Sequence, residues 1–166
     1  MQIHPGRFTA DTDDDFVVFL IGMRVNKPWK VHQWLPVAAR MAVMQRQLMQ
    51  RPDLGCLGIQ NFAGRTTLSL QYWRDFDALD RYAKDPELAH LQPWRAFNKD
   101  VRDSGDVGIW HETYHVASGA YETVYGNMPT FGLAAATSHT RVGQRGQTAA
   151  HRIGQSVTDE PAVQGY

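Results

Sequence analysis

Cysteine, excess charge and long apolar runs are all scarce in this sequence. Cys56 is the single cysteine among 166 residues, which excludes an internal disulfide and fits a reducing cytoplasm. Lysine plus arginine and aspartate plus glutamate both number 17, so the formal net charge is zero. A neutral chain is a poor nucleic-acid binder, because phosphate neutralisation supplies most of that affinity. No apolar run reaches the roughly 18 residues that span a bilayer, and none near the N-terminus predicts a secretory signal. We therefore expect a cytoplasmic protein that binds neither nucleic acid nor membranes.

The signature motifs of several large enzyme classes are also absent. The sequence holds no GxGxxG or P-loop pattern, no GxSxG elbow and no zinc-type cysteine and histidine spacing. These absences count against nucleotide-dependent transfer and serine-hydrolase chemistry. Hydrophobic residues make up 43% of the chain, which is ordinary for a globular domain of this length.

What the sequence does contain is an alternation of strand and helix patterns. Continuous or alternating apolar runs, rich in β-branched and aromatic residues, are typical of strands. Apolar residues recurring every three or four positions are typical of helices, and Asp75 suits the N-cap of the second helical region. In chain order these patterns predict a strand at 16–25, a helix at 31–49, strands at 56–62 and 66–73, a helical region at 75–102 and a strand at 109–116.

This β-α-β-β-α-β order is that of a ferredoxin-like α+β fold. It predicts one antiparallel sheet with both helices on one face. Because the strands are so apolar, we expect a second copy of the chain to cover the other face, giving a homodimer. The predicted organisation is an N-terminal arm at 1–15, the domain at 16–137 and an extended or disordered C-terminal tail at 138–166, where there is little to bury.

The stretch IWHETYHV at 109–116 gathers several ionisable side chains. On a helix, His111 and His115 could share a metal ion, but the neighbouring residues favour a strand, on which four residues span roughly 13 Å. Two imidazoles so far apart cannot both bind one ion at about 2 Å. On a strand His111 and Glu112 point to opposite faces, and each is a candidate acid–base group. The alternative for each is a structural, hydrogen-bonded side chain.

His90 is a second candidate in the helical region before that strand. At 100° per residue it shares the inward stripe of the helix with Phe97, and Trp94 lies close beside them. Pro93 predicts a kink there, which could open a pocket between helix and sheet. The alternative is a core histidine that hydrogen-bonds a backbone carbonyl.

Aromatic and basic residues complete the candidate set. Tyr72 and Trp73 belong to an aromatic cluster that is mainly core but can line a ligand pocket. Arg24 and Arg74 stand at strand ends, where a guanidinium can bind an anionic group. The alternative is that both arginines are ordinary exposed side chains.

Three long segments resemble a known family. They read VVFLIGMRVNK, LQYWRDFDALDRYAKDPELAHLQPWRAFNK and VGIWHETYHVASGAYETVYGNMPTFGL. The resemblance covers about residues 7–142 and is to an uncharacterised bacterial group labelled "monooxygenase family protein". That group belongs to the dimeric α/β-barrel superfamily, whose fold agrees with the order of elements read from the patterns.

The resemblance also implies chemistry. The superfamily includes haem-degrading monooxygenases, chlorite dismutases, aldoxime dehydratases and cofactor-free quinol monooxygenases. In its haem branches the iron ligand is typically a histidine on the helix before the last strand, and His90 in ELAHLQPW matches that placement. The leading hypothesis is therefore a monooxygenase-type oxidoreductase acting on a small organic molecule, with haem bound through His90. Trp94 and Phe97 would then wall the pocket, Glu112 or His111 would move protons, and Arg74 would meet an anionic group.

Three alternatives stay open. One is a cofactor-free monooxygenase, in which His90 or His111 is the base for an acidic, electron-rich aromatic substrate. Another is a haem-dependent dehydratase of the same superfamily. The third is a non-enzymatic homodimer that binds haem or another small ligand unchanged.

Overall fold

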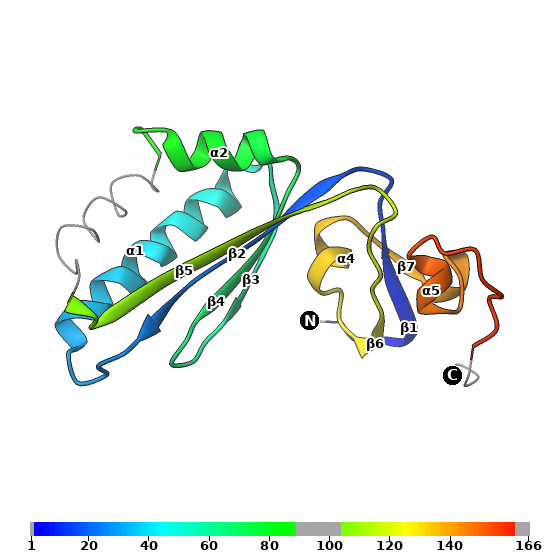
Figure 1. Ribbon diagram of the computed structural model, residues 1–166, viewed down its shortest axis with the longest axis horizontal. Coiled ribbons are helices and arrows are strands. Elements are labelled where there is room, and N and C mark those ends of the chain that lie inside the picture. Colours follow the sequence, from blue (N-terminus) through cyan, green and yellow to red (C-terminus); the bar gives the residue numbers. More distant parts are fainter. Residues whose placement is uncertain (1, 89–103, 162–166) are drawn as a thin grey trace. The chain divides into compact units, whose positions relative to one another are not determined.

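The computed structural model describes residues 2–88 and 104–161, which form two compact units (Figure 1). The central unit comprises Val17–Tyr114. The terminal unit joins the two ends of the chain, the residues up to Phe16 and those from His115 onward. Each unit has a sheet of its own.

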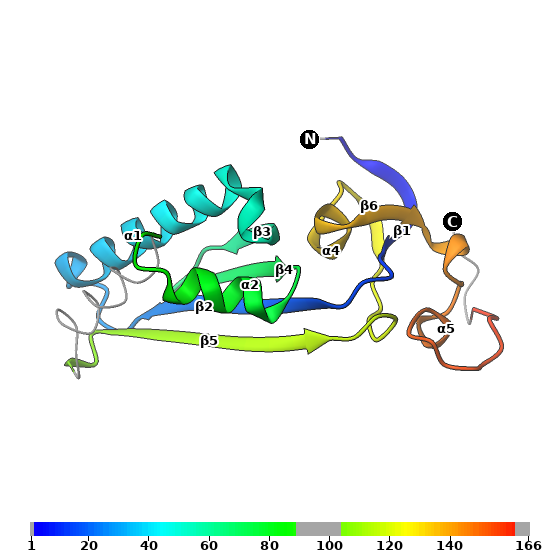
Figure 2. The same ribbon diagram turned by 90° about the horizontal axis from the view of Figure 1, so that it is seen from above.

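The central unit holds a four-stranded sheet in the order β3-β4-β2-β5. Strand β4 runs antiparallel to both of its neighbours, and Figure 2 shows both helices on the same side of the sheet. The order of elements confirms the predicted β-α-β-β-α-β arrangement and the ferredoxin-like α+β class. The elements are β2 (Phe16–Val25), α1 (Val31–Gln50), the 3-10 helix η1 (Pro52–Leu54), β3 (Cys56–Phe62), β4 (Leu68–Trp73), α2 (Phe76–Lys84) and β5 (Val107–Val116).

The second helix begins where the sequence predicts. The carboxylate of Asp75 accepts a hydrogen bond of 2.6 Å from the backbone N–H of Ala78, which satisfies one of the free donors of the first turn. This start places Leu79 and Tyr82 against the sheet, where they pack in one cluster with the fully buried Trp73. The cap therefore fixes the residue at which α2 begins, and the helix packs Leu79 and Tyr82 against the sheet.

A buried carboxylate anchors the start of β5. Asp106 is 2% exposed and lies 2.6 Å from the Nζ atom of Lys27 and 2.7 Å from that of Lys30. Hydrogen bonds from these two ammonium groups hold the pKa of Asp106 below its usual range. The backbone carbonyl of Asp106 also accepts from the N–H groups of Asn26 and Lys27. The loop before α1 is thereby fixed to the start of β5.

The terminal unit is built on a three-stranded sheet in the order β6-β1-β7. Strand β1 pairs antiparallel with β6 and with β7, and Thr9 stands opposite Thr140. Strand β1 lies within the predicted N-terminal arm and β7 at the start of the predicted C-terminal tail, and the two strands are paired. The elements are β1 (His4–Asp11), β6 (Tyr125–Met128), α4 (Gly132–Ala136), β7 (Ser138–Arg141), the 3-10 helix η3 (Val142–Gln144) and α5 (Ala149–Arg152).

Polar contacts hold the last part of the terminal unit. Arg152 is 5% exposed; its Nε donates to Glu122 at 3.0 Å, and its Nη1 donates to the carbonyls of Gly146 and Gln147. The carboxylate of Asp159 accepts from the backbone N–H groups of Gln147 and Thr148. A segment ordered by buried arginine and backbone acceptors carries few apolar residues, which explains why its composition is typical of a disordered tail.

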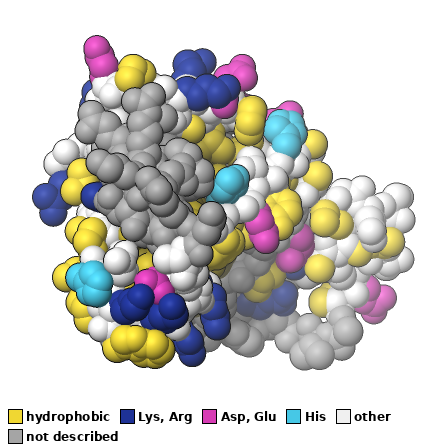
Figure 3. Space-filling view, turned by 60° about the vertical axis from the view of Figure 1, so that its left-hand side comes forward, with side chains coloured by type: hydrophobic (Ala, Val, Ile, Leu, Met, Phe, Trp, Pro, Cys, Tyr) yellow, Lys and Arg dark blue, Asp and Glu magenta, His cyan; other side chains and the backbone are white. Residues whose placement is uncertain are grey.

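The described surface is mixed in character. On the face displayed in Figure 3, basic and acidic side chains are interspersed among hydrophobic ones. Among the helices of the described ranges, none combines the length and the apolar character required to cross a membrane.

Candidate functional site

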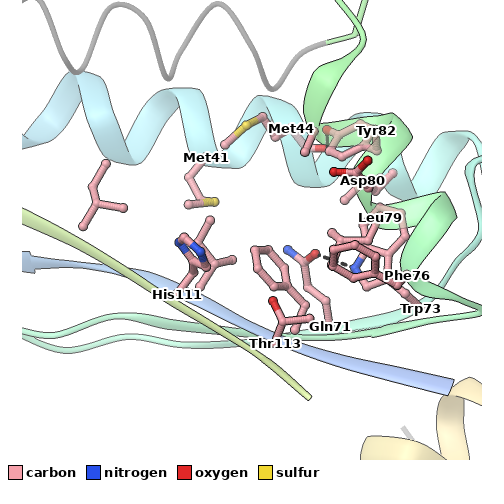
Figure 4. Close-up of a pocket in the computed structure, with 15 residues that line it drawn as sticks. Met41, Met44, Gln71, Trp73, Phe76, Leu79, Asp80, Tyr82, His111 and Thr113 are labelled. Carbon is pink, nitrogen blue, oxygen red and sulfur yellow. Dashed lines mark hydrogen bonds between the residues drawn. The ribbon is translucent and has the colours of Figure 1, made fainter. Parts of the chain in front are cut away.

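A cavity of about 210 Å³ lies between the sheet and the helices of the central unit (Figure 4). Strands β2, β4 and β5 supply its floor, and α1 and α2 supply its roof. Most of the lining is aliphatic, aromatic or methionine. The polar side chains that reach it are Gln71, Asp80, Tyr82, His111 and Thr113. An apolar cavity with a few polar groups is the usual form of a small-molecule site.

Three floor residues lie in one row across the sheet. Gln71 on β4 and Phe19 on β2 are paired across the two strands, and the rings of Phe19 and His111 have centroids 5.8 Å apart. Because neighbouring strands lie about 4.8 Å apart, Gln71 and His111 are separated by roughly 10 Å with the phenyl ring between them. A flat molecule lying over Phe19 would have a polar group on either side.

The carboxamide of Gln71 is held in a fixed orientation. Its side chain is 5% exposed; Oε1 accepts a 3.0 Å hydrogen bond from Nε1 of Trp73, and Nε2 donates to Oγ of Ser69 at 3.3 Å. A primary amide carries two N–H donors. Only one is used within the described part of the chain, so the other is available to a ligand in the cavity.

His111 differs from Gln71 in being exposed. Its imidazole has no hydrogen-bond partner among the described residues and contacts Phe19 alone as an aromatic neighbour. A neutral imidazole accepts a proton at one ring nitrogen while the other nitrogen donates. Figure 4 shows this side chain rising from β5 beneath Met41 of α1. His111 is thus the side chain of the described lining best suited to take a proton from a bound molecule.

The roof of the cavity contributes the carboxylate of Asp80 and the phenol of Tyr82. Asp80 forms an ion pair with Lys84 at 2.7 Å. Burial raises the pKa of Tyr82 to about 12, so its hydroxyl stays protonated, and it donates to the carbonyl of Met44 at 3.4 Å. Tyr82 is therefore a donor and not a base at neutral pH.

The structure brings together two of the residues that the sequence indicates, His111 and Trp73. Tyr72 and Glu112 lie on the opposite face of the sheet, because alternate residues of a strand point to opposite sides. Glu112 is exposed and accepts a 2.6 Å hydrogen bond from the hydroxyl of Tyr114. This hydrogen bond to the carboxylate raises the pKa of Tyr114. Glu112, predicted to transfer protons, and Tyr72, predicted to line the pocket, therefore both point away from the cavity.

The two arginines do not line the cavity. Nε of Arg74 lies 2.9 Å from the carboxylate of Asp75 beside the N-terminus of α2. Nη1 of Arg24 donates to Oγ1 of Thr66 at 2.6 Å. Both guanidinium groups therefore have partners of their own. Three further predicted residues lie outside the described ranges: His90, Trp94 and Phe97.

Gln71 is the functional candidate that the sequence patterns did not single out. In LSLQYW it shares one strand face with Ser69 and Trp73, and that face looks toward the helices. A polar residue on the buried face of a strand needs hydrogen-bond partners. The two-residue period of this strand is the sequence signal that indicates Gln71, because it places Gln71 on the same face as Trp73.

The described part of the chain contains no cluster of side chains that could bind a metal ion. Within residues 2–88 and 104–161 no three histidine, cysteine, aspartate or glutamate side chains come together as ion ligands. His111 and His115 lie on the extended strand β5.

A family model and a curated protein both match this chain. The family model described as Monooxygenase af470-like matches residues 16–133. The curated protein "Monooxygenase af470" of Aspergillus fumigatus is 32% identical over 120 residues, which cover 67% of this chain and 42% of that protein.

A crystal structure of an aldoxime dehydratase in complex with butyraldoxime has a similar fold. It superposes with a TM-score of 0.61 at 14% sequence identity, covering 81% of this chain and 39% of that one. This chain therefore spans less than half the length of either relative.

Proposed function

Because the chain belongs to the Monooxygenase af470-like family, we propose that its cavity is the active site of a monooxygenase-type oxidoreductase acting on a small organic molecule. The observation that supports this most is the row of Gln71, Phe19 and His111 across the cavity floor. It combines an oriented donor, an aromatic surface and a base candidate in one apolar site.

The substrate that suits this row is a flat, electron-rich aromatic molecule with an acidic CH₂ group. Its ring lies over Phe19, and the free N–H of Gln71 donates to a substrate oxygen. His111 removes a proton from the CH₂ group, and the Gln71 donor stabilises the negative charge on that oxygen. The apolar lining excludes water and so strengthens both interactions.

Oxygen then reacts with the substrate carbanion directly. A carbon–oxygen bond forms, the second proton leaves the same carbon, and the oxygen–oxygen bond breaks. The carbon gains a carbonyl oxygen and loses four electrons, which reduce the two oxygen atoms to that carbonyl oxygen and to water. The protein contributes the base, the donor and the dry surface.

Haem is a poorer match to the described lining. A haem group needs an axial ligand and partners for its propionates, and no lysine or arginine is among the described residues that line the cavity. The assignment of His90 as an iron ligand stays a prediction, and so do the pocket walls assigned to Trp94 and Phe97. The dehydratase alternative is supported by likeness of fold alone.

Oxygen uptake tests the proposed function. The purified chain is given anthrone and 1,8-dihydroxyanthrone, each of which carries an acidic CH₂ group between two aromatic rings, under isotopically labelled oxygen. We expect uptake of one O₂ per product, label in the new carbonyl of the anthrone product, and no change when a metal chelator is added. Recovery of both compounds unchanged would support the binding-only alternative. Turnover that begins only after haemin is added would overturn the cofactor-free mechanism.

We also propose that two copies of the chain associate through the face of the central sheet that carries no helix. Phe19 and Ile21 point into the cavity, so the residues between and beside them point the other way. On that face Val18 stands opposite Tyr72, and Leu20 stands opposite Leu70. An apolar sheet face of this kind is normally covered.

Replacing Leu70 by glutamate is expected to weaken this association. A carboxylate at the centre of an apolar interface is left unpaired, so the dimer Kd should rise at least about 30-fold. Sedimentation over a concentration series measures it. Met49→Glu is the matched control, because Met49 is 70% exposed on α1. A monomeric wild-type protein, or equal Kd values for wild type and the Leu70 variant, would contradict the proposed interface.

A further inference from the structure

A second cavity, of about 270 Å³, lies between α1 and the same sheet. It extends toward the hairpin of β3 and β4 and is lined there by Phe62 and Ala63. The two cavities share three residues: Ile21 of β2, Ile109 of β5 and Met41 of α1. The border between them is therefore two isoleucines on the floor and one methionine on the roof.

The second cavity is suited to hydrocarbon. On its roof Val37, Ala38, Met41 and Gln45 follow the three- and four-residue spacing of one helix face. Its amide groups are engaged with each other: Gln45 donates to Asn61 at 2.8 Å, and Asn61 donates back at 2.9 Å. The two amides bind each other and the rest of the roof is apolar, so an apolar occupant fits this cavity.

We propose that the second cavity receives an apolar tail of the substrate and that Met41 determines which tails pass the border. The inference rests on the proposed active site and names its substrate class, an aromatic head bearing an alkyl chain. The head lies over Phe19 between His111 and Gln71, and the chain runs beneath α1. Methionine is unbranched, with several rotatable bonds, so its side chain can move aside for a chain that replaces its contacts.

A series of para-alkylphenols, from phenol to octylphenol, tests the proposal by calorimetric titration. In the wild-type protein affinity should rise about fourfold for each methylene that enters the second cavity, since a buried CH₂ contributes about 0.8 kcal/mol. In Met41→Trp the larger indole closes the border. Because Met41 also lines the first cavity, the phenol affinity of this variant serves as its own reference, and the gain in affinity from phenol to octylphenol should disappear.

Two further variants separate the tail cavity from general damage. Ala38→Phe fills the second cavity without lining the first, and it should lose the same gain while keeping phenol affinity. Met49→Trp places the same indole on the exposed side of α1, and its whole series should match the wild type.

Three outcomes would overturn the proposal. One is octylphenol affinity unchanged in both Met41→Trp and Ala38→Phe, and another is wild-type affinity that does not rise with chain length. Equal loss in Met49→Trp would show that any indole on α1 has this effect. Binding needs no turnover, so these results are independent of the proposed function. A chain-length dependence that persists without oxygen uptake would overturn the oxygenase chemistry and leave the tail site standing.

Discussion

Replacing His111 by glutamine is expected to lower kcat for oxygen uptake by about 10²–10⁴-fold. A positioned general base contributes a factor of that size, and among the described residues of the cavity His111 is the imidazole. Glutamine keeps a hydrogen-bonding side chain of similar length but takes up no proton at neutral pH. KM should change far less than kcat, because the aromatic surface over Phe19 is intact.

His115→Gln provides the matched control for that measurement. His115 lies on the same strand, is also exposed, and does not line the cavity. We expect its kcat to stay within about twofold of the wild-type value, as for surface changes that leave the reacting groups untouched. A His111→Gln protein with wild-type kcat would rule out His111 as the base and direct attention to His90, the other base that the sequence predicts.

Trp73→Ala is expected to reduce the free energy of unfolding by about 3–5 kcal/mol, the usual cost of removing a buried Trp or Phe side chain. Trp73 is fully buried, and its ring lies 5.6 Å from that of Tyr82. The truncation leaves a void between sheet and α2. It also removes the donor for Oε1 of Gln71, which adds the cost of an unsatisfied buried acceptor.

Urea denaturation at a fixed protein concentration measures this loss. Trp29→Ala is the control, because Trp29 is 75% exposed and its removal should change the free energy of unfolding by no more than about 0.5 kcal/mol. Equal losses in the two variants would mean that Trp73 contributes no more to the core than an exposed tryptophan does.

The central unit was predictable because its elements have strong periodic patterns. The apolar run at 16–25 coincides with β2, the helical spacing at 31–49 falls within α1, and Asp75 caps α2. Each of these signals is local, and each agrees with the sheet that brings the elements together.

The terminal unit was not predictable in the same way. Strand β7 is four residues long, too short for a two-residue period to stand out. Its partner β1 lies more than a hundred residues earlier, and pairing over such a separation leaves no local pattern. The order around Arg152 comes from an ion pair with Glu122 and from backbone carbonyls, which composition does not reveal.

The candidate site was predictable in part. The alternation in IWHETYHV puts His111 and Glu112 on opposite faces, but the sequence does not say which face the helices cover. In the structure the helices cover the face that carries His111, so His111 lines the cavity. The same alternation directs Glu112 away from the cavity, where it binds Tyr114. Gln71 escaped notice because a glutamine in a strand looks the same whether it is buried or exposed. The role of His90 stays a prediction.

The position of β5 at the edge of the central sheet has a consequence for solubility. Within the described residues β2 is its only neighbour in the sheet, so the outer side of β5 presents unpaired backbone groups. Such an edge is a template for chain-to-chain aggregation, and charged or polar side chains along it are a common protection. His111, Glu112 and His115 supply that protection here. Variants that replace several of these side chains by apolar residues should precipitate on heating at temperatures below their unfolding transition.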